Sequence, residues 1–426
     1  MFHTMEEIEL FLNERNYLGI KLGLDRVNYL LDRLNHPENE LMTVHVAGTN
    51  GKGSTIQFLQ NSLMASGYRV GMFTSPSFTG VRGHILVNGK EITEEEILSV
   101  LNDLLPFIHE LDEKNNHPTT FEIITVLAIA FFSNNVDIAL IETGMGGKDD
   151  TTNVVVPTVS IITNVSIDHQ NHLGKTMEEI TNHKAGIIKE NTPVVVGNVQ
   201  SESMNIIKYK AKEKNAPLYV LNRDFFYRIE YGSNFHCTFL NEKEFQLSLQ
   251  MDGKHQAENA VVAIMTLICL ENQQIQIHWS NAICSINRTE LPGRFEQVSN
   301  NPPIILDSAH NIASIKAFVD IAQTTYKDRK KKLLFAGFKD KQLEEMIQIL
   351  APYFSNITVT TFDHERAAKL EDLESVVKRF HFKFTPYWKE ELIKFQTTSS
   401  DEVLFITGSL HFIIQVREYL LNNKYK

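Results

Sequence analysis

The chain has very little cysteine, with three residues among 426, namely Cys237, Cys269 and Cys284. At these wide spacings they predict neither a disulfide framework nor a zinc site. A reducing compartment is the simplest expectation, and we predict a cytoplasmic protein. The first seven residues include two glutamates and lack the pattern of a signal peptide, which agrees with that expectation.

An excess of basic residues is also missing, and so are long apolar runs. Lys and Arg number 41 against 52 Asp and Glu, which gives a formal net charge of −11. Nucleic-acid and anionic membrane surfaces are bound by neutralising phosphates with Lys and Arg, so we expect neither partner. The most apolar stretch, residues 123–132, is too short to span a bilayer. A few cations in a cleft can still attract an anionic small molecule.

The chain does have enough length for two hydrophobic cores, because 426 residues exceed the usual limit of one. In its first half, short apolar runs alternate with helix-compatible segments, which predicts a doubly wound, mainly parallel sheet. Residues 219–251 alternate polar and apolar positions as antiparallel strands do. The periodicity breaks at 289–294, and a new strand–helix alternation follows. We therefore predict an α/β protein with one domain at 1–292 and a smaller one at 293–426.

The main motif is a glycine-rich turn between an apolar run and a helix-compatible segment. It reads Gly48-Thr49-Asn50-Gly51-Lys52-Gly53-Ser54-Thr55. Glycines let backbone N–H groups converge on an anion, and Lys52 adds a positive charge. A serine or threonine hydroxyl suits Mg²⁺, and a helix N-terminus favours phosphate. Because Gly53 separates the lysine from the hydroxyl, an ordinary glycine-rich turn remains an alternative to a phosphate loop.

Other polar residues follow predicted strands, where a parallel sheet gathers its ligands. Glu142 and His169 stand at such ends and could join a phosphate-loop hydroxyl around Mg²⁺, although His169 could equally be an ordinary loop histidine. Lys184 lies in a predicted helix, where its spacing alone favours a solvated lysine. Asp307 and Ser308 follow a strand of the second domain, where N-capping of the next helix is the simpler interpretation.

Taken in order, the motifs resemble those of a known family. They are His45 to Ser54, Thr74-Ser75-Pro76, Thr163-Asn164 with Asp168-His169, Lys184-Ala185-Gly186-Ile187, His255-Gln256 with Asn259-Ala260, Gly293-Arg294 and Asp307 to Asn311. This ordered set resembles the folylpolyglutamate synthases, including the bacterial members that are also dihydrofolate synthases, within the Mur ligase superfamily. The resemblance extends from about Tyr17 to Ser409.

The resemblance implies a phosphate-loop ATPase domain with a mainly parallel sheet, followed by a smaller Rossmann-like domain. It implies an ATP- and Mg²⁺-dependent amide ligase that joins L-glutamate to a folate through an acyl phosphate, and we expect a monomer. Use of dihydropteroate stays open, because the loops depart from the family pattern at Ser77, Gly83, Lys148 and Asp149. A Mur-type ligase with a non-folate acceptor and a non-catalytic ATP-binding protein remain the alternatives.

The resemblance also implies a role for particular residues. ATP would be bound by Thr49, Asn50, Gly51, Lys52, Gly53, Ser54, Asn259, Arg294 and Asp307. Mg²⁺ would be ligated by Ser54, Ser75, Glu142 and His169. Substrates would be contacted by Thr120, Phe121 and Glu122 at the pterin, and by His310 and Ser409 at the incoming glutamate. Lys52, Lys184 and His310 would be catalytic, with Lys184 carbamylated and therefore anionic.

Overall fold

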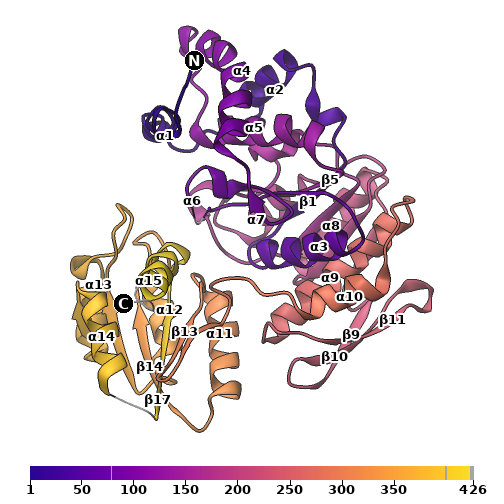
Figure 1. The fold of residues 1–426 in the computed structure, drawn as a ribbon. Helices are drawn as coiled ribbons and strands as arrows, with labels where there is room; N and C mark the ends of the chain where they lie inside the picture. Colours follow the sequence, from indigo (N-terminus) through magenta and orange to yellow (C-terminus); the bar gives the residue numbers. More distant parts are fainter. Residues whose placement is uncertain (78, 399–400, 423–426) are drawn as a thin grey trace. The chain divides into compact units, whose positions relative to one another are not determined.

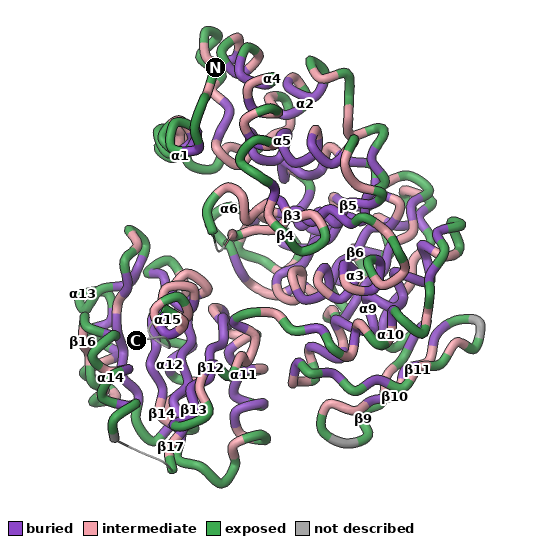
Figure 2. The backbone as a smooth tube through the Cα atoms, in the orientation of Figure 1, coloured by how far each residue is buried: buried purple, intermediate pink, exposed green. Residues whose placement is uncertain are grey.

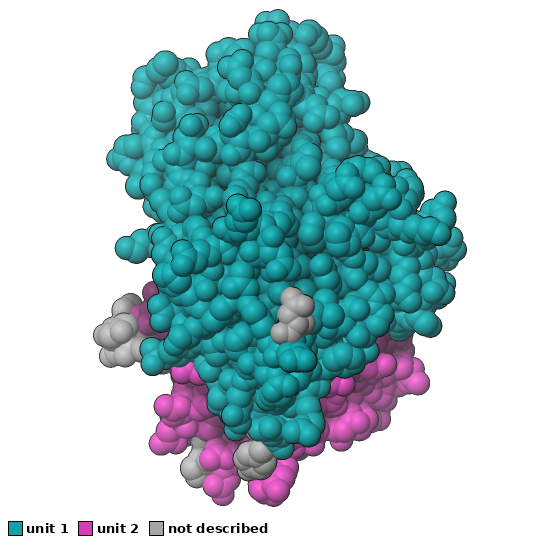
Figure 3. Space-filling model, turned by 90° about the vertical axis from the view of Figure 1, so that its right-hand side faces the viewer, with its two compact units in different colours: residues 1–249, 256–289 teal, residues 250–255, 290–426 magenta. Residues whose placement is uncertain are grey.

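The computed structural model describes residues 1–77, 79–398 and 401–422. The chain divides into two compact units (Figure 3). Unit 1 comprises Met1–Leu249 and Gln256–Thr289, and unit 2 comprises Gln250–His255 and Glu290–Lys426. Each unit is built on its own sheet with helices packed against it (Figure 1), which confirms the predicted α/β class.

The sheet of unit 1 has the strand order β4-β3-β2-β5-β1-β6-β7-β8. The central strand β1 (Thr43–Ala47) is buried throughout and pairs in parallel with β5 (Ile138–Glu142) and β6 (Val159–Asn164). Burial on both faces explains why β5 is apolar from Ile138 to Ile141. The other strands are β2 (Val70–Phe73), β3 (Ile85–Val87), β4 (Lys90–Glu91), β7 (Val194–Asn198) and β8 (Leu218–Val220). Only the pairings of β3 run antiparallel in this sheet, within the described residues.

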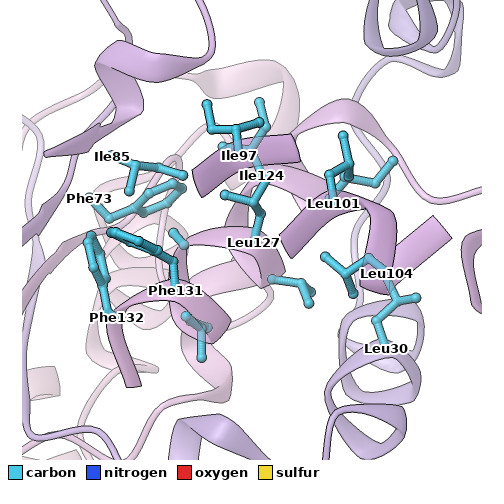
Figure 4. Close-up of a cluster of buried hydrophobic side chains, with 14 of the residues drawn as sticks. Leu30, Phe73, Ile85, Ile97, Leu101, Leu104, Ile124, Leu127, Phe131 and Phe132 are labelled. Carbon is cyan, nitrogen blue, oxygen red and sulfur yellow. The ribbon is translucent and has the colours of Figure 1, made fainter. Parts of the chain in front are cut away.

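Helices cover this sheet, with α3 (Lys52–Ala65) on one side of β1 and β5 and α5 (Thr120–Asn135) on the other (Figure 1). The tube in Figure 2 is buried along β5 and β6 and along most of α9. Apolar side chains of α2, α4 and α5 form one core with β2 and β3 (Figure 4). The remaining helices of unit 1 are α1 (Met5–Asn13), α2 (Asp25–Arg33), α4 (Glu94–Glu113), α6 (Gln170–Leu173), α7 (Met177–Ala185), α8 (Ser201–Glu213), α9 (Lys254–Glu271) and α10 (Trp279–Asn287). Short 3₁₀ helices lie at Asn16–Leu18, Pro37–Asn39, Arg82–His84, Thr151–Val154 and Leu240–Glu242.

Helix α4 continues through Pro106 to Glu113, although a proline commonly ends a helix. Proline inside a helix removes one backbone hydrogen bond and costs about 3 kcal/mol. Buried residues beyond it, Ile108 and Leu111, continue the apolar face into the core, and their burial offsets that cost.

The polar–apolar alternation of residues 219–251 correctly predicts antiparallel strands. β9 (Phe226–Tyr231), β10 (Asn234–Thr238) and β11 (Glu244–Ser248) form a separate antiparallel sheet. The start of the stretch differs, because β8 pairs in parallel with β7 and extends the large sheet.

Unit 2 has a sheet with the strand order β12-β13-β17-β14-β15-β16, in which only the edge strand β12 runs antiparallel among the described pairings. Its strands are β12 (Glu296–Asn300), β13 (Pro303–Leu306), β14 (Lys330–Phe335), β15 (Asn356–Thr360), β16 (Lys383–Thr385) and β17 (Glu402–Thr407). Its helices are α11 (Ile312–Thr325), α12 (Leu343–Leu350), α13 (Leu370–Phe380), α14 (Trp388–Thr398) and α15 (Leu410–Asn422). Two apolar cores, one with α11, α12 and α13 and one with α14 and α15, contain alternate residues of these strands. Across the described part of both units, no helix has the length and apolar character needed to cross a membrane.

Candidate functional site

The glycine-rich turn joins β1 to α3 in unit 1, and two of its glycines are required by close packing. A Cβ atom on Gly48 would lie 1.8 Å from Thr163 Oγ1, and one on Gly51 would lie 2.3 Å from Asn259 Oδ1. Gly51 also has a φ of 82°, a left-handed conformation that glycine adopts without strain, and it directly precedes the first turn of α3. The backbone at this helix N-terminus can therefore approach an anion closely.

The end of β6 holds the turn in place. Asn50 donates its backbone N–H to Asn164 Oδ1 at 3.0 Å, and the Asn164 amide donates to the Asn50 carbonyl at 2.8 Å. Thr49 Oγ1 donates to the Ser166 carbonyl at 3.0 Å and accepts the Ser166 N–H at 2.9 Å. Because these bonds already fix Thr49 and Asn50, the loop is organised before any ligand arrives.

Lys52 brings its ammonium group to the carboxylate that follows β5. Its Nζ lies 3.7 Å from Glu142 Oε1 and donates to the Gly48 carbonyl at 3.1 Å. Glu142 is 5% exposed, and its Oε2 accepts the backbone N–H of Ser75 at 3.4 Å. Ser54 is buried in the first turn of α3. The structure thus brings Lys52, Ser75 and Glu142 together, as expected for residues at neighbouring strand ends.

The predicted Mg²⁺ ligands fit the metal by their chemistry. Ser54, Ser75 and Glu142 offer oxygen atoms, which Mg²⁺ prefers. His169 starts α6 in a left-handed conformation, with its side chain 42% exposed and its Nε2 3.9 Å from Asp168 Oδ2. Among the described residues, no group of three or more His, Cys, Asp and Glu side chains is arranged around a common metal position. The predicted set has only one carboxylate and one imidazole, so phosphate and water oxygens would have to complete it.

Lys184 is buried in α7, with 3% of its surface exposed, so the interpretation as a solvated helix lysine is wrong. Burial, together with the positive charge of Lys52, lowers the pKa of Lys184 to about 7 against the opposing effects of Asp168 and Asp150. Helical spacing cannot reveal this burial, because the charged groups that act on the Lys184 ammonium, Lys52, Asp168 and Asp150, come from other segments of the chain. The backbone of α7 also packs closely on a glycine loop, where a Cβ atom on Gly147 would lie 3.1 Å from the Lys184 carbonyl.

Asp150 is a buried carboxylate to which the motifs assign no role. Its side chain accepts the backbone N–H groups of Met145 at 2.6 Å and Thr152 at 3.1 Å. Burial raises the pKa of Asp150, and these hydrogen bonds oppose the rise. Its place in a glycine-rich loop is the signal that could have singled it out.

The predicted pterin residues stand at the start of α5. The Phe121 ring lies 5.7 Å from the Phe73 ring, and a Cβ atom on Gly144 would meet Phe121 at 2.5 Å. Glu122 is fully buried, accepts the Thr119 N–H, and pairs with Arg26 Nε at 2.8 Å. Thr120 donates its hydroxyl to the Leu12 carbonyl at 2.7 Å. Of the three, Phe121 borders the loop that follows Glu142, whereas Thr120 and Glu122 make bonds within the protein.

Unit 2 places Arg294, Asp307 and His310 around the end of β13. Asp307 accepts the backbone N–H groups of Phe295 and Ala309, each at 2.9 Å. Burial raises the pKa of Asp307, and the Arg294 charge opposes that rise. Arg294 donates to the Ser308 hydroxyl. N-capping by Asp307 or Ser308 is a wrong interpretation, because Asn311 caps α11 by accepting the Ser314 N–H.

The ends of β13 and β17 meet beside His310. The Gly408 N–H donates to the Ala309 carbonyl at 3.0 Å, which places the Gly408-Ser409 turn next to the loop that contains His310. His310 Nδ1 donates to the Ser308 carbonyl at 2.9 Å. Ser409 is 2% exposed, and no group in the described part of the chain forms a hydrogen bond with its Oγ. A buried hydroxyl of this kind is available to a ligand.

Comparison with known families gives two matches. Residues 46–267 match the Mur ligase middle domain, and residues 293–410 match the Mur ligase glutamate ligase domain. Among individual proteins, the dihydrofolate synthase/folylpolyglutamate synthase of Bacillus subtilis is 34% identical over 99% of this chain and 100% of its own length. The folylpolyglutamate synthase of Lacticaseibacillus casei is 29% identical over 94% of both chains.

Solved structures agree with these matches. The folylpolyglutamate synthase of Thermotoga maritima superposes with a TM-score of 0.85 at 31% identity, covering 99% of this chain and 98% of that one. The enzyme of Mycobacterium tuberculosis, solved with ADP and AMPPCP, has a TM-score of 0.88 at 25% identity and covers 97% of this chain and 98% of its own. The predicted order of a phosphate-loop domain and a Rossmann-like domain is confirmed.

Proposed function

The chain belongs to the folylpolyglutamate synthase and dihydrofolate synthase family of Mur ligases, and on this premise we propose that it joins L-glutamate to a folate at the expense of ATP. The observation that supports this most directly is the constellation at the end of β1. There a helix N-terminus, the Lys52 ammonium group and the buried Glu142 carboxylate converge. Such a site suits a carboxylate-activating phosphoryl transfer.

The proposed reaction has two steps. A folate carboxylate attacks the γ-phosphorus of ATP, which forms an acyl phosphate and releases ADP. The amine of L-glutamate then attacks the activated carbonyl, the amide forms, and phosphate leaves. Because the folate carboxylate and ATP are both anionic, catalysis is mostly positioning and charge neutralisation, and Lys52 with the backbone N–H groups from Gly51 to Ser54 supplies both.

The metal is part of the proposal, and Ser54, Ser75, Glu142 and His169 would hold it. Bound Mg²⁺ would neutralise charge on the phosphate oxygens. Thr49 and Asn50 would shape the loop around the phosphates, because the end of β6 already fixes both residues.

Carbamylation of Lys184 is also part of the proposal. Only a neutral amine reacts with CO₂, and burial lowers the pKa of Lys184 to about 7, so a substantial neutral fraction exists near neutral pH. The same Lys52 charge that disfavours a second ammonium group would stabilise the carbamate anion. The modification would thereby place an anionic group among Lys52 and the predicted metal ligands.

The remaining predicted residues complete the proposal. Asn259, Arg294 and Asp307 would contact the nucleotide. His310 would receive the incoming glutamate together with the Ser409 hydroxyl, which forms no hydrogen bond with any described residue. Phe121 would stack on the pterin, while Thr120 and Glu122 would shape that pocket from behind. The three widely spaced cysteines and the net charge of −11 support a cytoplasmic protein without a nucleic-acid or anionic-membrane partner, and the resemblance alone suggests a monomer.

The test is an acceptor assay on the purified protein. ATP, Mg²⁺ and labelled L-glutamate are supplied with tetrahydrofolate or dihydropteroate, and ADP release is compared with label incorporated into folate. We expect equal amounts of ADP and amide with tetrahydrofolate. The assay with dihydropteroate determines whether the protein also joins glutamate to that acceptor. Absence of acceptor-dependent ADP release with both compounds would overturn the folate assignment. Nucleotide binding without amide formation would indicate a non-catalytic ATP-binding protein.

A further inference from the structure

One peptide group beside the predicted metal site forms a hydrogen bond through its carbonyl and another through its N–H. It is the peptide bond between Thr74 and Ser75, in the loop that follows β2. Its carbonyl accepts a hydrogen bond from His84 Nδ1 at 2.7 Å, and its N–H donates to Glu142 Oε2 at 3.4 Å. His84 therefore reaches the Glu142 carboxylate through a single intervening peptide group.

The contact between Thr74 and His84 is reciprocal. The Thr74 N–H donates to the His84 carbonyl at 3.1 Å, in addition to the side-chain bond in the other direction. These two hydrogen bonds join the end of β2 to the start of β3, so they fix the distance between the two ends of the loop. Ser75, the next residue, is thereby oriented as well.

The geometry determines the tautomer of His84. A carbonyl oxygen can only accept, so Nδ1 must have the proton. Burial lowers the pKa of His84, which keeps the ring neutral near pH 7. Its neighbours are aromatic, since the Phe73 ring lies at 6.3 Å and the Phe121 ring at 6.4 Å. In such surroundings a hydrogen bond is electrostatically stronger than one exposed to water, and consecutive bonds through one peptide group polarise each other.

We propose that His84 is a positioning residue for the metal site, and that it acts by orienting the Thr74–Ser75 peptide so that Ser75 and Glu142 face the ion together. This inference rests on the proposed function, because it needs Ser75 and Glu142 to be ligands. His84 itself touches neither the metal nor the substrates in this role. Groups that form hydrogen bonds with metal ligands typically contribute 10- to 100-fold to metal affinity, and we expect about tenfold here.

The test compares three substitutions that separate the hydrogen bond from the ring. His84→Phe keeps an aromatic ring but has no donor. His84→Asn places an amide N–H near the position of Nδ1, whereas the amide of His84→Gln sits one bond farther out. The probe is Mn²⁺ with AMPPCP, and the free Mn²⁺ signal in electron paramagnetic resonance gives the dissociation constant of the bound metal. Thermal unfolding is measured for every variant.

We expect His84→Phe and His84→Gln to weaken Mn²⁺ binding about tenfold and His84→Asn to stay within about threefold of the original protein. Unchanged Mn²⁺ affinity in a folded His84→Phe or His84→Gln protein would overturn the inference. Equal weakening in a folded His84→Asn protein would overturn it too, since the donor would be present without effect. If His84→Phe fails to fold, the Mn²⁺ affinity of His84→Gln provides the test. If the original protein binds no Mn²⁺ with AMPPCP, the metal site of the proposed function fails, and this inference fails with it.

Discussion

The side chain of Asn259, in α9, lies against Gly51, the residue that directly precedes α3. A Cβ atom at Gly51 would come within 2.3 Å of Asn259 Oδ1. The Asn259 amide also donates to Gln256 Oε1 at 3.1 Å, which fixes its position on α9. A helix far away in the sequence therefore forms one wall of the phosphate loop, and that wall leaves no room for a side chain at Gly51.

Two glycine substitutions in this loop should have opposite effects on stability. In Gly51→Ala, the left-handed φ costs about 1–2 kcal/mol, and the contact with Asn259 adds to that cost. In Gly53→Ala, no atom of the described residues lies within 4 Å of the new Cβ, and alanine favours the helix by up to about 1 kcal/mol. Denaturant unfolding of both variants measures the difference.

Nucleotide binding by the Gly51→Ala and Gly53→Ala variants tests where the ATP phosphates lie in this loop. If the ATP phosphates approach Gly53, its new methyl group occupies their space, and we expect Gly53→Ala to lose at least tenfold in ATP affinity while remaining fully stable. Calorimetric titration with AMPPCP measures this. Undiminished affinity in Gly53→Ala would show that the phosphates do not lie against this glycine.

Lys184→Ala should abolish ligation, and a short carboxylate such as acetate should restore part of the activity by replacing the carbamate. The readout is acceptor-dependent ADP release with and without acetate, and Lys184→Arg is the control because a guanidinium does not form the carbamate. Full activity in Lys184→Arg would contradict the role proposed for the modification.

Carbamylation of the original protein should also depend on pH in a defined direction. Because the pKa of Lys184 lies near 7, the ammonium form predominates below that pH and the reactive neutral amine above it. Carbon-13 NMR with labelled bicarbonate should show a carbamate signal that grows as the pH rises through about 7. A signal that does not change across this range would contradict the assignment.

Ser409→Ala should leave the protein as stable as before and raise the KM for L-glutamate about tenfold. The Ser409 hydroxyl is buried and forms no hydrogen bond within the described residues, so its removal breaks no internal bond. Loss of one hydrogen bond to a charged ligand is worth about 1.5–3 kcal/mol. Thr407→Val is the matched control, because Thr407 Oγ1 donates to the Ala309 carbonyl at 3.3 Å and its removal should affect stability. An unchanged KM would remove Ser409 from the glutamate site.

The ion pair between Arg26 and Glu122 should support the start of α5. The two side chains are 13% and 1% exposed, so Arg26→Ala leaves a buried carboxylate without its cation. We expect a loss of about 3–5 kcal/mol of unfolding free energy and a raised KM for the folate. The double variant Arg26→Met with Glu122→Met should recover much of the stability. Arg33→Ala is the control, because Arg33 and Glu110 form an exposed pair and its loss should change little.

Local signals in the sequence predict much of the fold. The structure has capping boxes at Thr93 and Thr176, and each can be recognised in the sequence because it depends on residues only three positions apart. The apolar runs around β1 and β5 similarly predict central parallel strands. The end of α4 could not be predicted, since proline normally stops a helix and only the surrounding core explains why this one continues.

The candidate site likewise has features that the sequence predicts and features that depend on tertiary packing. The rule that ligands gather at strand ends predicts the proximity of the turn at Gly48 and Glu142, and the distance from Lys52 to Glu142 agrees with it. The burial of Lys184 depends on tertiary packing, which brings Lys52, Asp168 and Asp150 from other segments near its ammonium group, so neither spacing nor composition reveals it. The link from His84 to Glu142 is equally hidden, because it passes through backbone atoms that no side-chain pattern records.

Unit 2 is discontinuous in the sequence, because Gln250–His255 belongs to it although Gln256–Thr289 returns to unit 1. A Cβ atom on Gly253 in this short segment would meet Ile321 of α11 at 2.6 Å, so the segment packs closely on a helix of unit 2. A gene fragment that begins at residue 290 or 293 therefore omits part of the folded unit and uncovers apolar surface on α11. Dissection, circular permutation or domain exchange would have to preserve all three points where the chain passes between the units, at 249–250, 255–256 and 289–290, rather than cut the chain once.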